Sequence, residues 1–570
     1  MLKNFSLSII SGILLFLCWP PKESFTILIF FSLVPVLFIS QQFTVKNLSF
    51  LKFFGFTYLS FFTFNFLTTY WINFAHFGGA VFAILCNSIF MTLLLLVYSL
   101  VKRNHKSLSD YILLPSIWIS FEYLHLNWDL SWPWLNLGNV FSAKVDWVQW
   151  YTFTGTLGGT FWILILNLMI FNFFNFLSQK ISQNSHLSSS KMNLITENKF
   201  HFFKFFSLIL VIFYAPLIIS KKIEKDFLVN NFESTVKKKI NVLVVQPNID
   251  PYEEKFTTPQ FNQTSKILDE INDKIKEDTD YVILPETFLA NPIWQHNFKN
   301  NLDVKRFFKF LNEKKQLNYK DSTYNFPHHF IIGSTTLKLS SASYSSKPVK
   351  NNPGNYYKVH NSALQLSVEH KKNNFELINI YNKSKLVPGA EQLPFHKYLH
   401  KFFGDKILQI GSSTSLGNFS KQDSVNIFEN SNRPISVAPI ICYESIYGDY
   451  VRKFINLGAG VIFIITNDGW WKNTSGYKQH HLYAKLRAIE NRRYVARSAN
   501  TGISSVIDCF GNVVNYLDWD MFGVIDSNLP ILDYETFYTK HGDFLGRIAS
   551  FFFAVTLLNF LINNKLRNST

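Results

Sequence analysis

Cysteine is scarce in this chain, which has only four among its 570 residues. Cys18 and Cys86 lie in apolar runs, whereas Cys442 and Cys509 lie in a more polar part of the sequence. Their spacing matches no zinc-binding pattern and does not suggest a disulfide framework. Cys442 is therefore best treated as a chemical group in its own right.

Motifs for cofactors and nucleic acids are also missing. The sequence has no phosphate-binding loop and no cluster of metal ligands, so we expect no metal, nucleotide or prosthetic group. The formal net charge is +16, but the basic residues occur in short clusters between apolar runs. Because no nucleic-acid fold signature accompanies them, we do not expect a nucleic acid as partner.

Apolar residues, by contrast, are abundant and unevenly distributed. Hydrophobic residues make up 48% of the chain and aromatic residues 17%, which is high for a soluble protein. Residues 1–220 are dominated by Phe, Leu and Ile, whereas residues 221–545 form a mixed, charged sequence. The chain is therefore predicted to combine a membrane region with a globular region.

About eight runs are candidates for membrane-spanning helices, each of which needs about 20 apolar residues. The fifth and the eighth are short, and the first is interpreted as a retained helix because no small-residue cleavage site follows it. The runs cover residues 5–21, 25–41, 53–72, 79–101, 111–124, 157–178, 203–220 and 547–562.

The distribution of Lys and Arg predicts the orientation, since short cytoplasmic loops carry the excess. With the N-terminus inside, the cytoplasmic segments hold twelve basic residues, and the opposite short loops hold two, Lys22 and Lys144. Seven helices in a membrane domain at 1–222 then place a globular domain at 235–535 on the outer face of the membrane. An eighth helix at 545–565 returns the C-terminus to the cytoplasm.

A tryptophan-rich loop separates the fifth and sixth runs. Its tryptophans suit the aromatic belt at a membrane surface. The loop is interpreted either as a simple interfacial anchor or as one wall of a lipid-facing entrance. The residues are Trp128, Trp132, Trp134, Trp147 and Trp150.

Short β-branched runs mark the globular region as an α/β domain with a central sheet. Two helical stretches, 260–276 and 477–491, fall between these runs. The predicted strands cover 239–246, 280–285, 329–336, 361–367, 375–382, 434–442, 460–466, 493–498 and 503–508.

Three of these strands end in a reactive side chain, at the edge where open α/β sheets usually build their sites. Glu286 follows in VILPETF, Lys383 in YNKSKLVPGAE and Cys442 in APIICYES. Alone, each residue is more typical of a non-functional position: Glu286 of a solvated turn, Lys383 of the surface and Cys442 of a small core residue. Together they supply a thiol nucleophile, an ammonium that lowers its pKa and stabilises an oxyanion, and a carboxylate that serves as general base.

These residues resemble the nitrilase superfamily, which has a Glu, Lys and Cys triad in that chain order on an αββα sandwich. The whole chain is similar to the apolipoprotein N-acyltransferases, in which several membrane helices precede a nitrilase domain and one follows it. The matching segments are WPWLNLG at 132–138, VVQPNID at 244–250, ITNDGWW at 465–471 and the stretch at 479–502.

The resemblance implies roles for further residues. Glu391 stands eight residues after the triad Lys, as in the family, and is expected to support the site together with Tyr443 and Glu444. A structural role is the equal alternative for Glu391 and Glu444. Trp470 is expected at a substrate-gating position, with core packing as the alternative.

The sequence departs from the family pattern at two places. Pro388, Gly389 and Ala390 precede Glu391 where Pro-Phe-Gly is usual, which removes a phenylalanine. Phe256 stands where many members have a tryptophan, which keeps aromatic character but loses an indole N–H. The triad itself is intact.

The implied reaction transfers a fatty acyl group from a membrane phospholipid to Cys442 as a thioester. The acyl group then passes to the N-terminal amine of a diacylglyceryl-cysteine on an apolipoprotein. The alternatives are a membrane-tethered amidase with the same triad, and a non-catalytic binding protein or transporter. The predicted helices contain few ionisable residues to mark a solute path, Glu122 being the main candidate.

Aromatic residues are dense at 288–310, directly after the proposed base. We hypothesise a mobile lid that dips into lipid. A packed helix is the alternative that the periodicity favours.

Overall fold

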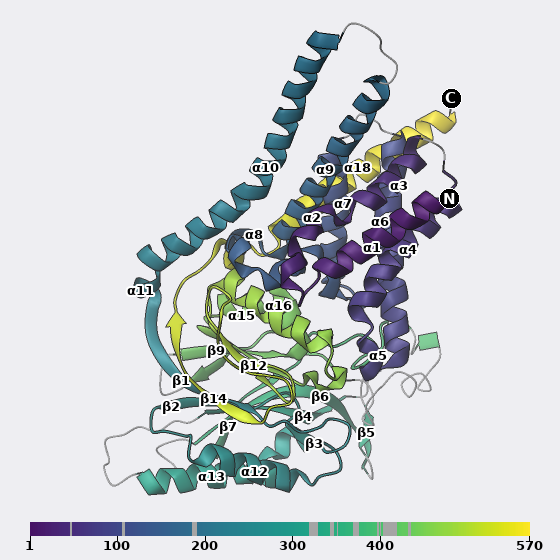
Figure 1. The fold of residues 1–570 in the computed structure, drawn as a ribbon. Helices are drawn as coiled ribbons and strands as arrows, with labels where there is room; N and C mark the ends of the chain where they lie inside the picture. The colour runs from purple at the N-terminus through teal and green to yellow at the C-terminus, as the bar shows by residue number, and fades with distance from the viewer. Residues whose placement is uncertain are drawn as a thin grey trace.

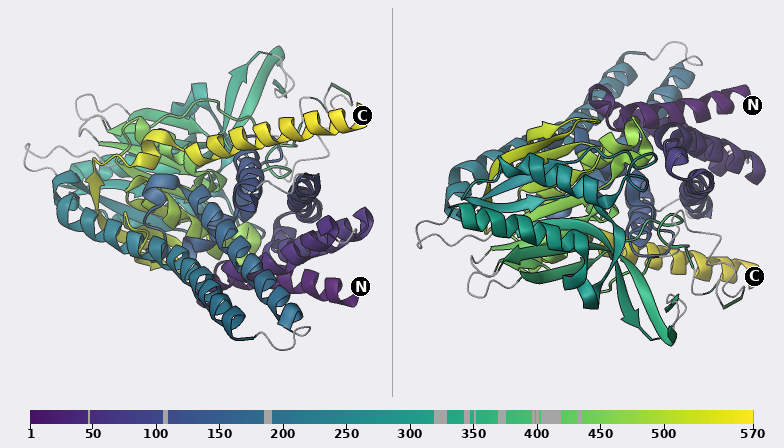
Figure 2. Two further views of the ribbon diagram at one scale, coloured as in Figure 1. Left: turned by 90° about the horizontal axis from the view of Figure 1, so that it is seen from above. Right: turned by 90° about the horizontal axis from the view of Figure 1, so that it is seen from below.

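The computed structural model combines a bundle of long helices with a two-sheet globular domain (Figures 1 and 2). It describes residues 1–45, 48–104, 109–184, 191–318, 329–341, 347–349, 352–368, 375–395, 398, 401–402, 419–430 and 435–569.

The apolar region and the C-terminal segment are helical, as predicted. The short elements η2 to η4 form the tryptophan-rich loop. The elements are α1 (Leu2–Cys18), η1 (Glu23–Leu28), α2 (Ile29–Ser32), α3 (Val34–Val45), α4 (Phe50–Thr69), α5 (Ile72–Ala75), α6 (Phe77–Asn104), α7 (Asp110–His125), η2 (Pro133–Leu135), η3 (Leu137–Ala143), η4 (Val145–Trp147), α8 (Tyr151–Thr154), α9 (Thr156–Asn184), α10 (Lys191–Asn230) and α18 (Phe544–Ser569).

Six helical segments in the described part of the chain are long and apolar enough to span a membrane. The first and fifth predicted spans correspond to α1 and α7, whose 17 and 16 residues fall short of the required length of about 20. Length and composition therefore support six of the eight predicted spans. The six are Glu23–Val45, Phe50–Thr69, Phe77–Asn104, Thr156–Ser178, Phe202–Asn230 and Phe544–Ile562.

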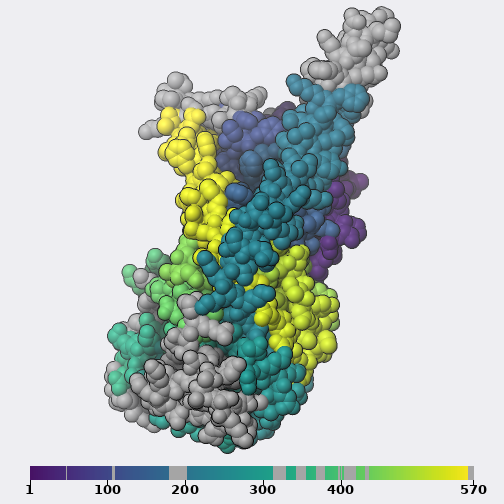
Figure 3. Space-filling view, turned by 90° about the vertical axis from the view of Figure 1, so that its left-hand side faces the viewer, coloured from purple at the N-terminus to yellow at the C-terminus, as the bar shows by residue number. Residues whose placement is uncertain are grey.

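Helix α10 lies on the outside of the bundle and runs down to the globular domain (Figure 3). None of its most apolar 18-residue window is buried inside the protein. An unburied apolar helix of this length suits contact with lipid.

The globular domain contains two sheets. The first has the order β14-β1-β2-β4-β6-β5, with β3 paired to β4 and β7 paired to β6, and the second has the order β13-β12-β11-β10-β9-β8. The strands are β1 (Val236–Gln246), β2 (Thr279–Ile283), β3 (Leu289–Trp294), β4 (His329–Ser340), β5 (Lys347–Val349), β6 (Asn352–Val368), β7 (Phe375–Asn382), β8 (Phe428–Asn430), β9 (Ile435–Ile441), β10 (Val461–Thr466), β11 (Val495–Ala499), β12 (Ser504–Ile507), β13 (Val513–Leu517) and β14 (Gly523–Leu532).

Helices cover the outer face of each sheet. α12 and α13 pack on the first sheet, and α15 and α16 pack on the second. The domain's helical elements are α11 (Phe232–Thr235), α12 (Gln260–Asn272), η5 (Gln295–Asn300), α13 (Leu302–Asn318), η7 (Cys442–Ile446), α15 (Gly448–Asn456), η8 (Asp468–Trp471), α16 (Ser475–Asn491) and α17 (Phe537–His541).

The alternation of apolar residues along β1 explains these layers. Ile240, Val242 and Val244 join the core shared with the second sheet. Leu243 and Val245 point to the other face and join the core under α12 and α13. Since successive side chains of a strand face opposite sides, one apolar strand fills both layers. The predicted αββα sandwich is confirmed.

Helix α16 lies between the second sheet and the helix bundle. Its Gln479 accepts a hydrogen bond from Trp134 Nε1 at 2.7 Å and donates one to the carbonyl of Pro20 at 3.0 Å. Trp134 is only 1% exposed. Its interpretation as an anchor at the lipid surface is therefore wrong, because the polar and aromatic contacts of α16 bury it at the junction.

Candidate active site

Glu286, Lys383 and Cys442 come together where three strands end. Glu286 lies just after β2 and Lys383 just after β7, both in the first sheet, whereas Cys442 directly follows β9 in the second. Lys383 Nζ lies 3.0 Å from Glu286 Oε1. All three residues are buried, so the site spans the two sheets at one edge of the sandwich.

Glu286 is held as an acceptor from several directions. Asn361 Nδ2 donates to its Oε1 at 2.7 Å, and the backbone N–H of Asn467 donates to its Oε2 at 3.1 Å. Burial alone would raise the pKa of Glu286, but the Lys383 ammonium and the hydrogen bonds outweigh it and lower that pKa. The carboxylate is therefore ionised at neutral pH, as a general base requires.

Lys383 is paired on both sides. Its Nζ lies 2.9 Å from Glu391 Oε1 in addition to its contact with Glu286. Burial opposes its charge, yet the two carboxylates raise the pKa of Lys383 well above its usual value. The ammonium is therefore permanent, and Glu391 contacts it directly.

Asn361, on β6, is a site residue that the sequence analysis missed. Its Nδ2 donates to Glu286 Oε1 at 2.7 Å and to Glu391 Oε1 at 2.9 Å. It thereby links the two carboxylates that flank Lys383. The available signal was an asparagine inside a predicted strand, where this residue type is depleted.

Cys442 is the first residue of η7 and lies in the sharp turn that directly follows β9. Its φ is +50°, a left-handed conformation that costs a residue with a side chain about 1–3 kcal/mol. Burial and the nearby Glu286 carboxylate raise the pKa of the Cys442 thiol well above its usual value, against the lowering effect of Lys383. The resting pair is therefore a thiol beside a carboxylate.

Glu444 connects the turn of Cys442 to the segment after Lys383. Its carboxylate accepts hydrogen bonds from Tyr381 Oη at 2.6 Å, from the N–H of Ser384 at 2.7 Å and from the N–H of Ile441 at 2.9 Å. Burial raises the pKa of Glu444 to about 7 despite these bonds. Glu444 thus fixes the relative position of two of the three strand ends.

Tyr443 joins the site to the tryptophan-rich loop. Its hydroxyl donates to the carbonyl of Ser131 at 2.9 Å, and its ring stacks on Trp132 at a centroid distance of 6.1 Å. The residue after the nucleophile is therefore fixed by the loop that leads out of α7.

The sequence matches two known families along its length. Residues 11–169 match the apolipoprotein N-acyltransferase N-terminal domain, and residues 241–536 match carbon-nitrogen hydrolase. The second match covers more than half of the chain. The chain belongs to the carbon-nitrogen hydrolase family.

Several relatives of this carbon-nitrogen hydrolase are named apolipoprotein N-acyltransferase. The apolipoprotein N-acyltransferase of Chlorobaculum tepidum is 26% identical over 550 residues, which cover 96% of this chain and 94% of the relative. That of Rickettsia prowazekii is 26% identical over 449 residues, covering 78% and 75%. That of Rickettsia bellii is 40% identical over 136 residues, covering 24% and 27%. The predicted resemblance is confirmed.

Trp470 of this carbon-nitrogen hydrolase is half-buried at the edge of the domain. Its ring stacks on Phe256 at 6.5 Å and meets Tyr252 edge-on at 5.5 Å. Both partners are exposed, Phe256 at 68%. The neighbouring Trp471 is the packed one, with Trp71 at 4.8 Å. Core packing therefore describes Trp471 and not Trp470.

The segment 288–310 is packed rather than free. It forms β3, η5 and the start of α13, and Phe288, Phe298 and Phe307 are at most 4% exposed. These rings fill the core between the first sheet and its helices. The packed alternative thus describes the segment, and the lid hypothesis is wrong for these rings.

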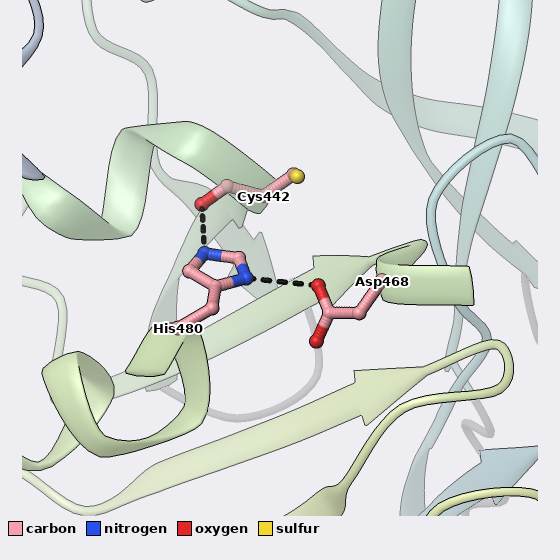
Figure 4. Close-up of side chains that lie close together, drawn as sticks. All are labelled: Cys442, Asp468 and His480. Carbon is pink, nitrogen blue, oxygen red and sulfur yellow. Dashed lines mark hydrogen bonds and ion pairs between the residues drawn. The ribbon is translucent and has the colours of Figure 1, made fainter. Parts of the chain in front are cut away.

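Cys442, Asp468 and His480 form a buried cluster that the sequence analysis did not identify (Figure 4). One donor atom from each lies within 4.8 Å of the others, the spacing of a candidate metal site. The Asp468 carboxylate, however, already binds Arg497 Nη2 at 2.5 Å and His480 Nδ1 at 2.8 Å. A cation there would compete with a guanidinium, so the geometry favours a hydrogen-bonded support.

Proposed function

We propose that the chain transfers a fatty acyl group from a membrane phospholipid, through a thioester on Cys442, to the N-terminal amine of diacylglyceryl-cysteine on apolipoproteins. One observation carries this proposal: Lys383 Nζ lies 3.0 Å from Glu286 at the edge of the sandwich where Cys442 begins its turn. The full-length similarity to apolipoprotein N-acyltransferases favours transfer over hydrolysis.

In the first half-reaction, Glu286 accepts the proton of Cys442 Sγ as the sulfur attacks the ester carbonyl carbon. Lys383 Nζ and backbone N–H groups after Cys442 stabilise the oxyanion. A C–S bond forms, the ester C–O bond breaks, and Glu286 returns the proton to the departing glycerol oxygen. The products are a thioester and a lysophospholipid.

In the second half-reaction, the amine nitrogen attacks the thioester carbon and Glu286 accepts a proton from it. A C–N bond forms and the C–S bond breaks. The thiolate then recovers a proton from Glu286, which restores the resting pair. The carboxylate thus acts alternately as base and acid, which its burial beside Lys383 supports.

The surrounding residues have supporting roles in this proposal. Glu391 holds Lys383, Glu444 fixes the turn of Cys442, and Tyr443 ties that turn to the loop before the sixth predicted span. Trp470 lies at the exposed edge and gates the entry of substrate. Its stacking on Phe256 supplies a flat apolar surface for an acyl chain.

Both substrates are anchored in lipid, which explains why the site is joined to a helix bundle. Withdrawing an acyl chain from the bilayer costs about 0.8 kcal/mol per exposed methylene. The excess of Lys and Arg in alternate loops supports a position in the bacterial cytoplasmic membrane with the catalytic domain on the periplasmic face. Acyl transfer then takes place along the membrane surface.

The test is product analysis with purified protein in phospholipid vesicles, with and without a diacylated lipopeptide. We expect triacylated lipopeptide and an equal amount of lysophospholipid from the wild type, and neither from Cys442→Ser. Free fatty acid as the main product, unchanged by the lipopeptide, would favour the amidase and overturn the transfer proposal.

A further inference from the structure

A buried chain of polar groups runs from β11 to the backbone of the nucleophile. Arg497 Nη2 lies 2.5 Å from Asp468 Oδ2, and Asp468 Oδ1 lies 2.8 Å from His480 Nδ1. The other ring nitrogen, Nε2, lies 3.2 Å from the carbonyl oxygen of Cys442 (Figure 4). The side chains of Arg497, Asp468 and His480 are all fully buried.

Further hydrogen bonds fix Arg497 and Asp468 in this row of polar groups. Arg497 also donates through Nη1 to the carbonyl of Ile503, and Thr466 Oγ1 donates to Asp468 Oδ1 at 2.8 Å. The aspartate therefore cannot rotate without losing several buried hydrogen bonds. The Asp468 carboxylate and the Cys442 carbonyl both accept only, so the ring links them by donating from Nδ1 to Asp468 and from Nε2 to the Cys442 carbonyl.

The Cys442 turn needs such support. A cysteine at φ +50° persists only where the surroundings determine its conformation. Its carbonyl accepts from Ser445 Oγ at 2.7 Å and faces His480 Nε2, which is also 3.0 Å from that hydroxyl. Figure 4 shows the carbonyl oxygen and the sulfur of Cys442 at opposite ends of the residue, and Sγ lies within 4.8 Å of a His480 ring nitrogen. Fixing the carbonyl therefore also fixes the direction in which the side chain leaves the turn.

We propose that His480, oriented by Asp468, is a positioning residue that holds the left-handed turn of Cys442 and so aims the thiol at the acyl carbonyl. This role rests on the proposed function, because it concerns the thiol that forms the thioester. His480 acts on the reaction only through the backbone of Cys442.

Two substitutions test the hydrogen bonds of the two ring nitrogens separately. The amide nitrogen of glutamine matches the position of Nε2, so His480→Gln keeps the bond to the Cys442 turn. The amide nitrogen of asparagine matches Nδ1, so His480→Asn keeps only the bond to Asp468. We expect His480→Gln to form the thioester within about threefold of the wild-type rate. For His480→Asn we expect a fall of about 100-fold in kcat, the usual effect of misplacing a reacting group by 1 Å, with KM for phospholipid unchanged.

The measurement is single-turnover thioester formation on the full-length protein in phospholipid vesicles, with thermal unfolding of both variants as the control for folding. Equal losses in the two variants, or two unaffected variants, would overturn the positioning role. A burst of p-nitrophenolate from a p-nitrophenyl ester gives the same comparison without phospholipid. A wild type that shows this burst but forms no thioester from phospholipid would overturn the assignment of phospholipid as acyl donor. The role of His480 could then still be measured with the p-nitrophenyl ester.

Discussion

At the scale of single residues, the site works through the pairing of buried charges. Lys383 lies between Glu286 and Glu391, so its positive charge is matched before any substrate arrives. Burial, together with the Glu286 carboxylate, keeps the pKa of the Cys442 thiol high and the thiol protonated. Glu286 has its pKa lowered and stays ionised, so a proton acceptor lies beside a proton donor. In the proposed mechanism, deprotonation of Cys442 is coupled to its attack on the substrate.

This arrangement predicts slow alkylation of resting Cys442. Because its thiol pKa lies well above 9, the thiolate fraction at pH 8 is small and grows with each unit of pH. We expect iodoacetamide to modify Cys442 at least about tenfold more slowly than a cysteine peptide at pH 8, the effect of one pKa unit. Peptide mass spectrometry measures the rate.

Glu286→Gln provides the matched control. Removing the carboxylate removes one cause of the raised Cys442 pKa, so alkylation at pH 9 should become faster while thioester formation is lost. Alkylation of the wild type that reaches a plateau near pH 7 would contradict this account of the site.

The proximity of Glu286, Lys383 and Cys442 could be predicted from sequence because each follows an apolar strand and stands beside a turn. Asn361 and His480 could not be assigned, since their roles depend on partners 75 and 38 positions away along the chain. Asp468 lies in a recognised segment, ITNDGWW, but nothing in that segment indicates its contact with Arg497. Tertiary contacts of this kind leave no periodic pattern.

At the scale of elements, all nine predicted strands and both predicted helices of the globular domain are present, and their ends agree within a few residues except at β6, which begins nine residues before the predicted 361–367. Five strands of the described chain were missed, and all but β13 have weak patterns. β5 and β8 have three residues each, too few for alternation to be recognised. Pro292 interrupts β3 and Pro530 interrupts β14, and proline inside a run argues against a strand.

Strand β4 packs closely against the backbone at Glu286, the proposed base, and this packing gives a prediction at the scale of elements. A Cβ on Gly333 would lie 2.4 Å from the carbonyl oxygen of Pro285 and 2.5 Å from Cα of Glu286. Gly333→Ala should therefore displace Glu286, destabilise the fold by about 1–3 kcal/mol and slow thioester formation by about 100-fold.

Gly55→Ala is the control for this substitution. Nothing lies within 4 Å of a Cβ on Gly55, which is exposed on α4, so alanine there should leave activity unchanged. It should also stabilise that helix by about 0.5–1 kcal/mol. Thermal unfolding and single-turnover acylation measure both effects, and an active Gly333→Ala would show that β4 does not set the position of the base.

At the scale of the whole molecule, the catalytic sandwich is built onto the bundle through its own core. Trp134 contacts α16 on one side and Trp71 on the other, and one apolar core is continuous across the junction. Tyr443, next to the nucleophile, binds the carbonyl of Ser131. The position of the site relative to the membrane is therefore fixed by packing rather than by a flexible linker.

The distribution of Lys and Arg predicts how this assembly is oriented in the membrane. Glu277 is exposed on the globular domain, and Lys52 is exposed in a segment expected in the cytoplasm. In intact spheroplasts, a membrane-impermeant maleimide should label Glu277→Cys and should not label Lys52→Cys until the membrane is opened. The reverse pattern would place the catalytic domain in the cytoplasm. The parent protein controls for its four native cysteines.

Intact-protein mass spectrometry after incubation with phospholipid alone tests the central claim most directly. The account predicts one acyl group on Cys442, absent from Cys442→Ser and lost when a diacylated lipopeptide is added and becomes triacylated. A folded protein whose Cys442 remains unmodified under these conditions would contradict the thioester mechanism and favour a non-catalytic binding role for the domain.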